Sequence, residues 1–583
     1  MNNSFSLARE VAFQELQKID STKILDATAK RKLSFLEEID VWEVTSVVEG
    51  NCGIVEIVLH VVFPHDFPLS LPKIFLSPND YENIKYVPHV DANRLICTYD
   101  EELTRPDPQN PSGVLIECIS KAKQILTDGL KQKNHEDFKN EFFAYWQCKY
   151  GSKDSVKEDV LSLIDSARED SELKLICLNK TLSSYNYILY QNDNISENFI
   201  NYLNDYKIGF EIIDVFHLGE LIFKMPPFSL QNRDVLKLIS ELSVEKQREF
   251  KKYINKNNSL KLITGVVRAN NDVHLIGWFH TFLNSNIKGF RPGHLPKYTL
   301  LKTLQSSTNV IRISPEIFTP KRLDERIGNK KGSSFRKLMI AGIGSIGSNL
   351  IYYLNSVSDI HFTLVDPDIL KVENIKRHFL GFDYVGLYKS DAVQHYLRAK
   401  NPIKQFISEK NSIIKICQSN IELLNQMDFI FICIGKANIS QWLGNAIKSG
   451  EIKKPLFFLW VEPYLAGGHC LIIYPNSKNY ETYFDEDGFF KNNIIDKKDY
   501  IDKPNLFTLR EAGCQTTFTP YNLSSVTSFL SAIFPKITNA FLNKSIESDS
   551  FTWIGDKEQI EKLGISLSDF GKKNFSETLV KHE

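Results

Sequence analysis

Apolar and polar positions follow three successive patterns along the chain. Residues 1–150 begin with apolar side chains at helical spacing, pass through the strand-like runs WEVTSVV and GIVEIVLHVVF, and end in helical stretches. This order predicts an α+β domain at the N-terminal end.

The next two patterns alternate strands with helices. Residues 151–310 mix helical segments such as ISELSVEKQREFKKYI with strand-like ones such as HLIGWFHTF, and no motif there identifies a chemistry. Residues 311–583 read as strand, glycine turn, helix, strand and acidic residue, which indicates a parallel sheet of Rossmann type. The sequence therefore predicts a multidomain α/β and α+β protein with a middle α/β linker domain of unknown role.

Composition narrows the class of partner. The 583 residues hold 70 Lys and Arg against 71 Asp and Glu, a formal net charge of -1, which gives no general attraction to nucleic acid or to an anionic membrane. The N-terminus MNNSFSLAREVAFQELQ has no signal-peptide pattern, and no apolar stretch approaches the roughly 18 residues of a membrane span. We expect a cytoplasmic protein with protein or small-molecule partners, no nucleic acid and no membrane.

The nine cysteines are spread through the chain, and no pair has CxxC spacing. An odd number without dense spacing does not indicate a disulfide framework, and four-cysteine zinc sites need paired ligands. We therefore expect no zinc and interpret most cysteines, including Cys433 and Cys470 in apolar runs, as core residues.

A glycine turn follows the first strand of the C-terminal pattern. In LMIAGIGSIGSNLIYYL, Gly342, Gly344 and Gly347 have the spacing that permits a tight turn, close approach of backbone to phosphate and close packing of the next helix. The next strand, HFTLVD, ends at Asp366, 19 residues past Gly347, where a carboxylate can accept hydrogen bonds from a ribose. These features predict a nucleotide site but do not separate NAD from ATP.

The following segment, DPDILKVENIKRHFLGFDYVGLYKSDAV, resembles the ubiquitin-activating and ThiF/MoeB-like adenylation family. The resemblance implies ATP as the nucleotide and places Asn374, Arg377 and Lys389 around its triphosphate. Cations along the phosphates suit attack on the α-phosphorus. A dehydrogenase has no such requirement, so an NAD oxidoreductase is disfavoured.

The match departs from the family after a later strand. Family members carry an Asp-Asn pair there, with the Asp serving Mg²⁺, whereas FIFICIGKANISQW has Gly435 and Lys436. Mg²⁺ remains the expected ion, but its ligand is unknown: it comes from elsewhere, or Lys436 partly replaces its charge.

A cysteine lies beyond the nucleotide motif, in REAGCQTTFTPYNLSS. The family uses a cysteine in this part of the chain to receive the acyl group from the adenylate, and the resemblance gives this role to Cys514. A thiolate is a strong nucleophile, and its thioester stays reactive enough for a second transfer.

The N-terminal part resembles a second family. The segment HVVFPHDFPLSLPKIFL resembles the ubiquitin-conjugating fold, and His89 stands eight residues before Cys97, in the order of that family's active-site histidine and cysteine. Cys97 is thus expected to carry a second thioester. The family's His-Pro-Asn is His89-Val90-Asp91 here, so its oxyanion-stabilising Asn is missing, and Asp91 or Asp100 is left to orient or deprotonate an incoming lysine.

The order of the two halves resembles bacterial fusion enzymes of CBASS antiphage operons. That resemblance implies activation of a partner protein's free C-terminus, the partner being a cGAS/DncV-like nucleotidyltransferase, and transfer to an amine on a target protein. It also implies a homodimer through the adenylation domain, with Arg326 reaching a neighbouring nucleotide site. Two rivals stay open: an adenylation-only enzyme with an inert docking domain, and a nucleotide-binding scaffold.

Overall fold

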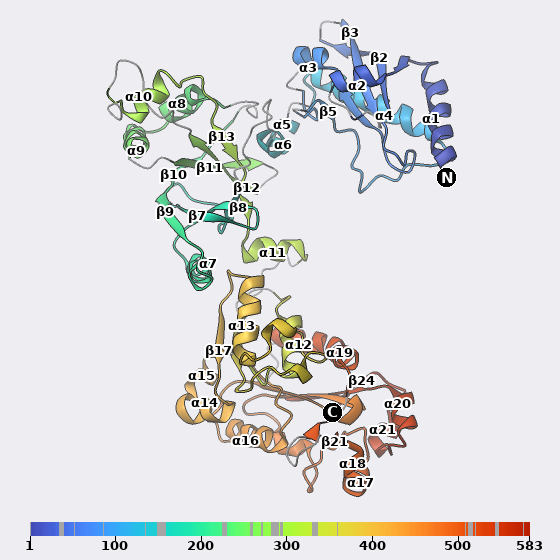
Figure 1. Ribbon diagram of the computed structural model, residues 1–583, viewed down its shortest axis with the longest axis vertical. Helices are drawn as coiled ribbons and strands as arrows, with labels where there is room; N and C mark the ends of the chain where they lie inside the picture. Colours follow the sequence, from blue (N-terminus) through green and yellow to red (C-terminus); the bar gives the residue numbers. More distant parts are fainter. Residues whose placement is uncertain are drawn as a thin grey trace. The chain divides into compact units, whose positions relative to one another are not determined.

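The computed structural model divides into two compact units (Figure 1). One comprises Met1–Asn192 and Ile208–Phe318, and the other Asp193–Lys207 and Thr319–Glu583. The structure describes residues 2–582 apart from 34–35, 37–39, 52, 85–86, 92, 135, 148–158, 224–229, 257–259, 270–271, 281–290, 292–294, 329–335, 358–359, 508, 511–516, 519–520, 543–546 and 575.

The N-terminal part is an antiparallel sheet with helices. Strands β1 to β5 pair in sequence order, and each strand is antiparallel to the next. Along β2 buried side chains mostly alternate with partly exposed ones, and Trp42, Leu59 and Phe67 lie in the core with the inner face of α4. The elements are α1 (Asn2–Leu16), β1 (Ser21–Ile24), α2 (Ala27–Lys32), β2 (Val41–Gly50), β3 (Gly53–Val62), β4 (Lys73–Leu76), α3 (Pro78–Ile84), β5 (Leu95–Ile96) and α4 (Pro111–Leu130).

The middle part contains two sheets, with strand orders β14-β6-β8-β7-β9 and β10-β11-β12-β13. Short helices α5 and α6 lead into it: Phe138 lies in the N-terminal core, whereas Trp146 is buried in the middle core and donates its indole N–H to Ile313 O at 2.9 Å. The elements are α5 (Asp137–Asn140), α6 (Phe142–Gln147), β6 (Val160–Ser162), β7 (Lys174–Leu182), β8 (Tyr185–Tyr190), β9 (Phe210–Asp214), β10 (Phe216–Glu220), α8 (Asn232–Ser240), α9 (Val244–Asn255), β11 (Lys261–Ala269), β12 (Asp272–His280), α10 (Lys297–Lys302), β13 (Ile311–Ile313) and β14 (Glu316–Ile317).

The second unit is built on one sheet, in the order β17-β16-β15-β18-β19-β20-β23-β24. The strands from β17 to β19 are parallel, and the rest pair antiparallel. The strands are β15 (Arg336–Ala341), β16 (Ile360–Val365), β17 (Phe406–Glu409), β18 (Phe429–Ile432), β19 (Leu456–Val461), β20 (Gly467–Ile473), β23 (Asp549–Ile554) and β24 (Leu579–His582), with a separate hairpin β21 (Leu509–Arg510) and β22 (Thr517–Phe518).

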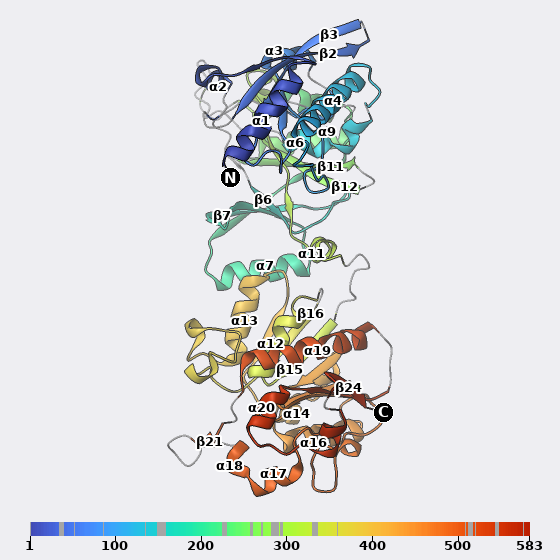
Figure 2. The same ribbon diagram turned by 90° about the vertical axis from the view of Figure 1, so that its right-hand side faces the viewer.

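Helices cover this sheet (Figure 2). A further helix of the unit, α7 (Asn194–Asp205), comes from the middle of the sequence and contacts α13 and the segment that follows α13: Asn198 Nδ2 donates to Ile403 O at 3.1 Å, and Asp205 forms an ion pair with Arg398. The other helices of the unit are α11 (Pro320–Arg326), α12 (Ser345–Leu354), η1 (Val372–Asn374), η2 (Phe382–Tyr384), α13 (Lys389–Lys400), α14 (Ile413–Asn420), α15 (Glu422–Asn425), α16 (Ala437–Lys448), η3 (Pro463–Leu465), η4 (Tyr480–Tyr483), α17 (Lys497–Asp502), α18 (Pro504–Phe507), α19 (Leu523–Leu542), α20 (Lys557–Lys562) and α21 (Asp569–Lys573).

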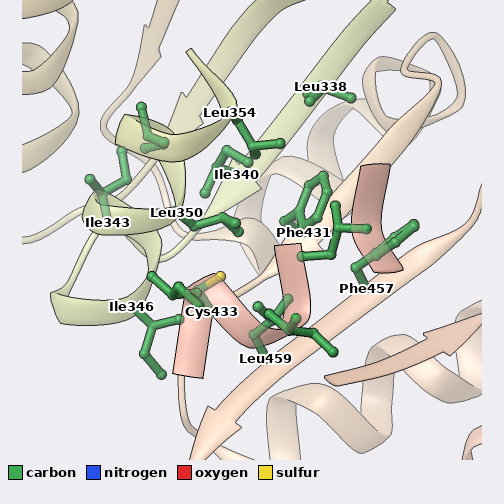
Figure 3. Close-up of a cluster of buried hydrophobic side chains, with 14 of the residues drawn as sticks. Leu338, Ile340, Ile343, Ile346, Leu350, Leu354, Phe431, Cys433, Phe457 and Leu459 are labelled. Carbon is green, nitrogen blue, oxygen red and sulfur yellow. The ribbon is translucent and has the colours of Figure 1, made fainter. Parts of the chain in front are cut away.

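The core of this unit lies where α12 packs on the central strands (Figure 3). Leu338 and Ile340 of β15, Leu350 of α12, and Phe431 and Phe457 of the next two strands are all buried there. Burying each such side chain contributes about 1.5–3 kcal/mol, so the glycine turn between β15 and α12 is held on a rigid base. Among the helices of the described residues, none combines the length and the apolar character that a membrane span needs.

Candidate functional site

The glycine turn connects β15 to α12, and at two positions only glycine fits. Gly342 has φ +89°, and a Cβ there would lie 2.8 Å from the carbonyl carbon of Cys433. A Cβ on Gly347 would lie 1.9 Å from Gly342 O. Gly344 is the N-cap of α12, and a Cβ there would meet no atom within 4 Å. The turn thus packs tightly on its inner side and leaves open space at the helix N-terminus, where anions bind favourably.

Asp366 holds this turn from the end of β16. Its carboxylate accepts the N–H of Ile343 at 2.6 Å and the N–H of Asp368 at 2.8 Å, and burial raises the pKa of the carboxyl. A carboxylate has about four acceptor positions, so two backbone bonds leave room for another donor. A ribose contact for Asp366 stays a prediction.

His378 is a further support of the turn. Leu380 N donates to its Nδ1 at 3.1 Å, so the ring proton is on Nε2, which donates to Ile343 O at 3.2 Å. Burial lowers the pKa of His378 to about 4, so the ring is neutral at pH 7. Sequence reasoning placed His378 in the motif but gave it no role, because its contact with residue 343 appears only on folding.

The structure brings Arg377 to the first turn of α12. Asn349 Nδ2 donates to Arg377 O at 2.9 Å and to Ser345 O at 2.7 Å, and the guanidinium lies 5.1 Å from the ring centre of Tyr521. Lys389 is largely buried, with Nζ 3.1 Å from Asp368 Oδ2.

The other predicted residues of this half lie around the same strand ends or at the surface. Asn374 accepts the N–H of Lys371 at 3.0 Å and so caps its own short helix. Lys436 is exposed and follows Gly435 (φ +69°) after β18, the direct neighbour of β15. Arg326 is exposed at the end of α11. In the part of the chain that the structure describes, no three His, Cys, Asp or Glu side chains gather as a metal site.

Of the two cysteines expected to react, Cys97 lies among the described residues. Cys514 lies outside the described residues. Cys97 is exposed directly after β5, and its N–H donates to His89 O at 2.8 Å. Cys433 and Cys470 are buried, which raises the pKa of both thiols and confirms them as core residues.

Cys97 opens onto a cavity of about 270 Å³. Its lining residues come from the 89–98 loop, from α4 and from the segment that follows α4: His89, Cys97, Thr98, Lys121, Gln124, Ile125, Asp128, Asn134 and Asp137. Asp91 and Asp100, the acids considered from the sequence, hold local turns instead, accepting the N–H groups of Leu95 and Glu102 at 2.8 Å each.

His89 is fixed by two carboxylates that the sequence did not reveal. Its Nδ1 pairs with Glu141, its Nε2 lies 3.1 Å from Asp137 Oδ2, and its backbone N–H donates to Glu141 at 2.9 Å. The hydrogen bond to Glu141 raises the pKa of His89 against the opposing effect of burial. Because both ring nitrogens face carboxylates, the imidazolium form is favoured, and His89 positions the Cys97 loop rather than accepting a proton.

Two known protein families match separate regions of the chain. Residues 19–154 match Prokaryotic E2 family B, and residues 326–533 match the ThiF family. The chain therefore joins an E2-like domain to a Rossmann-type adenylation domain and is an E1/E2-like conjugating enzyme. The predicted multidomain fold is confirmed, and the reaction class is ATP-dependent ubiquitin-like activation and conjugation.

Individual relatives are distant in sequence. The chain is 22% identical over 413 residues to the ATP-dependent ubiquitin transferase-like protein Cap2 of Pseudomonas aeruginosa (strain BWHPSA011 / Pa011), covering 67% of this chain and 69% of the relative. Among solved structures it is similar to selenomethionine PaaA, at 14% identity, 46% and 74% coverage and a TM-score of 0.28. It is also similar to E. coli MccB with ATP, at 15% identity, 40% and 64% coverage and a TM-score of 0.28.

Proposed function

We propose that this enzyme activates the C-terminal carboxylate of a partner protein and ligates it to an amine through two cysteines. The carboxylate attacks the α-phosphorus of ATP and pyrophosphate leaves. Cys514 then displaces AMP to form a thioester, Cys97 takes over the acyl group, and an amine on a target protein receives it. The observation that carries this proposal is the exposed Cys97 at its cavity, in one chain with an adenylation domain.

The nucleotide part of the proposal rests on the glycine turn. The open space at Gly344 and the N-terminus of α12 suit phosphates, and Gly342 and Gly347 let the backbone come close. Arg377 and Lys389 supply positive charge. Asn374 supplies an amide, and Asp366 the ribose acceptor.

Mg²⁺ is the expected companion of the triphosphate, since this ion is commonly held by phosphates, water and one or two carboxylates. Asp368 is the nearby carboxylate, and its side chain is 69% exposed beside Lys389. The ion would neutralise phosphate charge there, while Lys436 and Arg326 remain further candidates for that role from the same and a neighbouring chain.

The partner follows from the likeness to Cap2 and to CBASS fusion enzymes. We propose a cGAS/DncV-like nucleotidyltransferase as the protein whose C-terminus is activated. A homodimer is supported by exposed apolar side chains beside the nucleotide motif: Ile369, Val372, Phe382, Leu387 and Tyr388.

A non-reducing gel tests the relay. With ATP, Mg²⁺ and a cGAS/DncV-like nucleotidyltransferase, wild type should form a thiol-sensitive adduct. Cys514→Ala should abolish the adduct, and Cys97→Ala should trap it on Cys514. Pyrophosphate exchange that persists while Cys97→Ala still yields full product would favour the adenylation-only enzyme, and no exchange at all would favour the scaffold.

Arg377→Ala tests the nucleotide site independently of the two cysteines. We expect pyrophosphate exchange to fall by about tenfold to a hundredfold, because one charge-assisted bond to the transition state is lost. Lys410→Ala removes an exposed lysine that pairs with Asp391 and is the matched control.

A further inference from the structure

Within the described residues, the guanidinium of Arg377 forms no hydrogen bond and no ion pair. The backbone of this residue, in contrast, is fixed beside the first turn of α12. Asn349 Nδ2 and Ser345 Oγ, both of α12, donate to the backbone oxygen of Arg377 at 2.9 and 3.3 Å. A guanidinium carries its N–H donors in one plane, so these donors are open to an anionic ligand beside the helix N-terminus.

Tyr521 is held in a fixed place beside α12. It directly precedes Asn522, whose side chain accepts the N–H of Ser525 at 2.8 Å and so caps the start of α19. Helix α19 in turn is joined to α12, because the hydroxyls of Tyr353 and Ser531 form a hydrogen bond of 2.7 Å. The Tyr521 ring is partly buried against the core that these two helices share. The position of the ring is therefore set relative to α12.

The guanidinium of Arg377 lies over this ring, with Cζ 5.1 Å from the ring centre. That distance is within the roughly 6 Å at which the negative face of an aromatic ring attracts a cation. A ring face offers no strong hydrogen-bond acceptor, so it holds the guanidinium and leaves the N–H groups free for phosphate. A carboxylate at the same place would occupy those N–H groups and cancel the positive charge.

We infer that Tyr521 positions the guanidinium of Arg377 for the triphosphate of ATP. This inference rests on the proposed place of Arg377 beside the triphosphate. Tyr521 acts through Arg377, so it is a positioning residue of the adenylation step. An arginine side chain loses rotational freedom when a ligand holds its head group, and a ring that already restricts the side chain lowers that loss.

The contact should matter for the phosphates of the nucleotide and not for the nucleoside. Asp366, the predicted ribose acceptor, is held by the backbone N–H groups of Ile343 and Asp368 at 2.6 and 2.8 Å. Its position therefore does not depend on the ring of Tyr521. Loss of that ring should weaken the binding of a triphosphate and leave the binding of adenosine unchanged.

The test is calorimetric binding to the full-length enzyme, which needs no partner protein. The probes are α,β-methylene ATP with Mg²⁺ and adenosine, and adenosine is measured by competition. We expect Tyr521→Leu to weaken binding of the ATP analogue by about tenfold and to leave the affinity for adenosine unchanged. Tyr521→Phe keeps the ring face and should match wild type with both probes.

Two further comparisons separate the ring's charge attraction from its packing. Replacing Tyr521 by pentafluorophenylalanine keeps a ring of similar size but removes its negative face, and should weaken binding of the ATP analogue as Tyr521→Leu does. In a double-mutant cycle, Tyr521→Leu added to Arg377→Ala should cause no further loss, because the ring acts through that side chain.

Tyr352→Leu is the matched control. Tyr352 of α12 holds Lys400 in a similar way, with Nζ 4.8 Å from the ring centre, and it is exposed. Lys400 has no proposed place at the nucleotide, so this variant should bind both probes like wild type.

Wild-type affinity for the ATP analogue in Tyr521→Leu, together with a loss in Arg377→Ala, would overturn the inference. Parallel losses of both probes in Tyr521→Leu, an equal loss in Tyr352→Leu or additive losses in the double variant would also overturn it, because each would mark the ring as structural. Wild-type affinity in Arg377→Ala would instead overturn the proposed place of Arg377 at the triphosphate.

Discussion

The imidazole of His89 pairs through Nδ1 with the carboxylate of Glu141, and that carboxylate also accepts the backbone N–H of His89 at 2.9 Å. His89 has φ +66°, a left-handed conformation that is uncommon for a residue with a Cβ. Glu141 thus holds both the side chain and the strained backbone of the residue whose carbonyl binds Cys97 N.

Glu141→Gln should loosen the Cys97 loop. Losing a hydrogen bond between charged groups costs about 1.5–3 kcal/mol, so amide exchange at Cys97 should speed up by at least about tenfold. Hydrogen–deuterium exchange of residues 87–99 measures this. Glu136→Gln, on the exposed residue before α5, is the control, and unchanged exchange in Glu141→Gln would contradict the role.

The pairing of His89 with Glu141 also predicts that the stability of the Cys97 loop depends on pH. Because the pKa of His89 is raised above 6.5, its stabilising contribution is complete below pH 6.5 and is lost as the pH rises through the raised folded-state pKa. Protection of the Cys97 amide, corrected for intrinsic exchange, should therefore fall on the alkaline side in wild type. The fall should be absent in His89→Gln, and a persisting fall would assign it to another group.

Three glycine substitutions should separate folding from nucleotide binding. Gly347→Ala places a Cβ 1.9 Å from Gly342 O and should destabilise the C-terminal unit by about 2 kcal/mol or more. Gly344→Ala meets no atom and should leave the melting temperature unchanged, while it weakens ATP binding measured by calorimetry.

Gly381→Ala also meets no atom within 4 Å and serves as the control for both properties. Normal ATP affinity in Gly344→Ala would argue against phosphates at this helix N-terminus.

His378 should make the adenylation unit acid-sensitive. Since burial lowers its pKa to about 4, the neutral ring's contribution is fully present above pH 6.5 and is lost as the pH falls toward 4. One proton accounts for at most about 1.4 kcal/mol per pH unit. Urea unfolding at pH 6.5 and 4.5 should show a larger loss in wild type than in His378→Gln, and parallel losses would contradict this.

Glu462 should be a structural requirement of the second unit. It is buried, lies 2.9 Å from His469 Nε2, and accepts the N–H groups of Ile494 and Ile495 at 2.6 and 2.9 Å. Glu462→Gln turns a donor toward those N–H groups, and breaking such a buried pair costs about 3–5 kcal/mol. Thermal melts should show a lower melting temperature in Glu462→Gln. Glu481 is half-exposed beside Lys448, so Glu481→Gln should change the melting temperature little.

The sequence by itself determined the local chemistry of this protein. The spacing of Gly342, Gly344 and Gly347 after an apolar strand required the tight turn, and alternation in the N-terminal strands fixed which faces are buried. Spacing of this kind is readable because neighbouring residues share one strand or turn, so their relation follows from backbone geometry alone.

Only the tertiary structure decided which distant residues meet. Glu141 reaches His89 across 52 positions, Asp128 joins Cys97 at one cavity, and α7 leaves the middle of the chain to pack on α13. Asp91 and Asp100 were the acids considered from the sequence for the acceptor amine, yet each is used in a turn. The packing of α4 and α5 brings Asp128 and Glu141 close to the Cys97 loop. That packing depends on the whole core rather than on any local spacing.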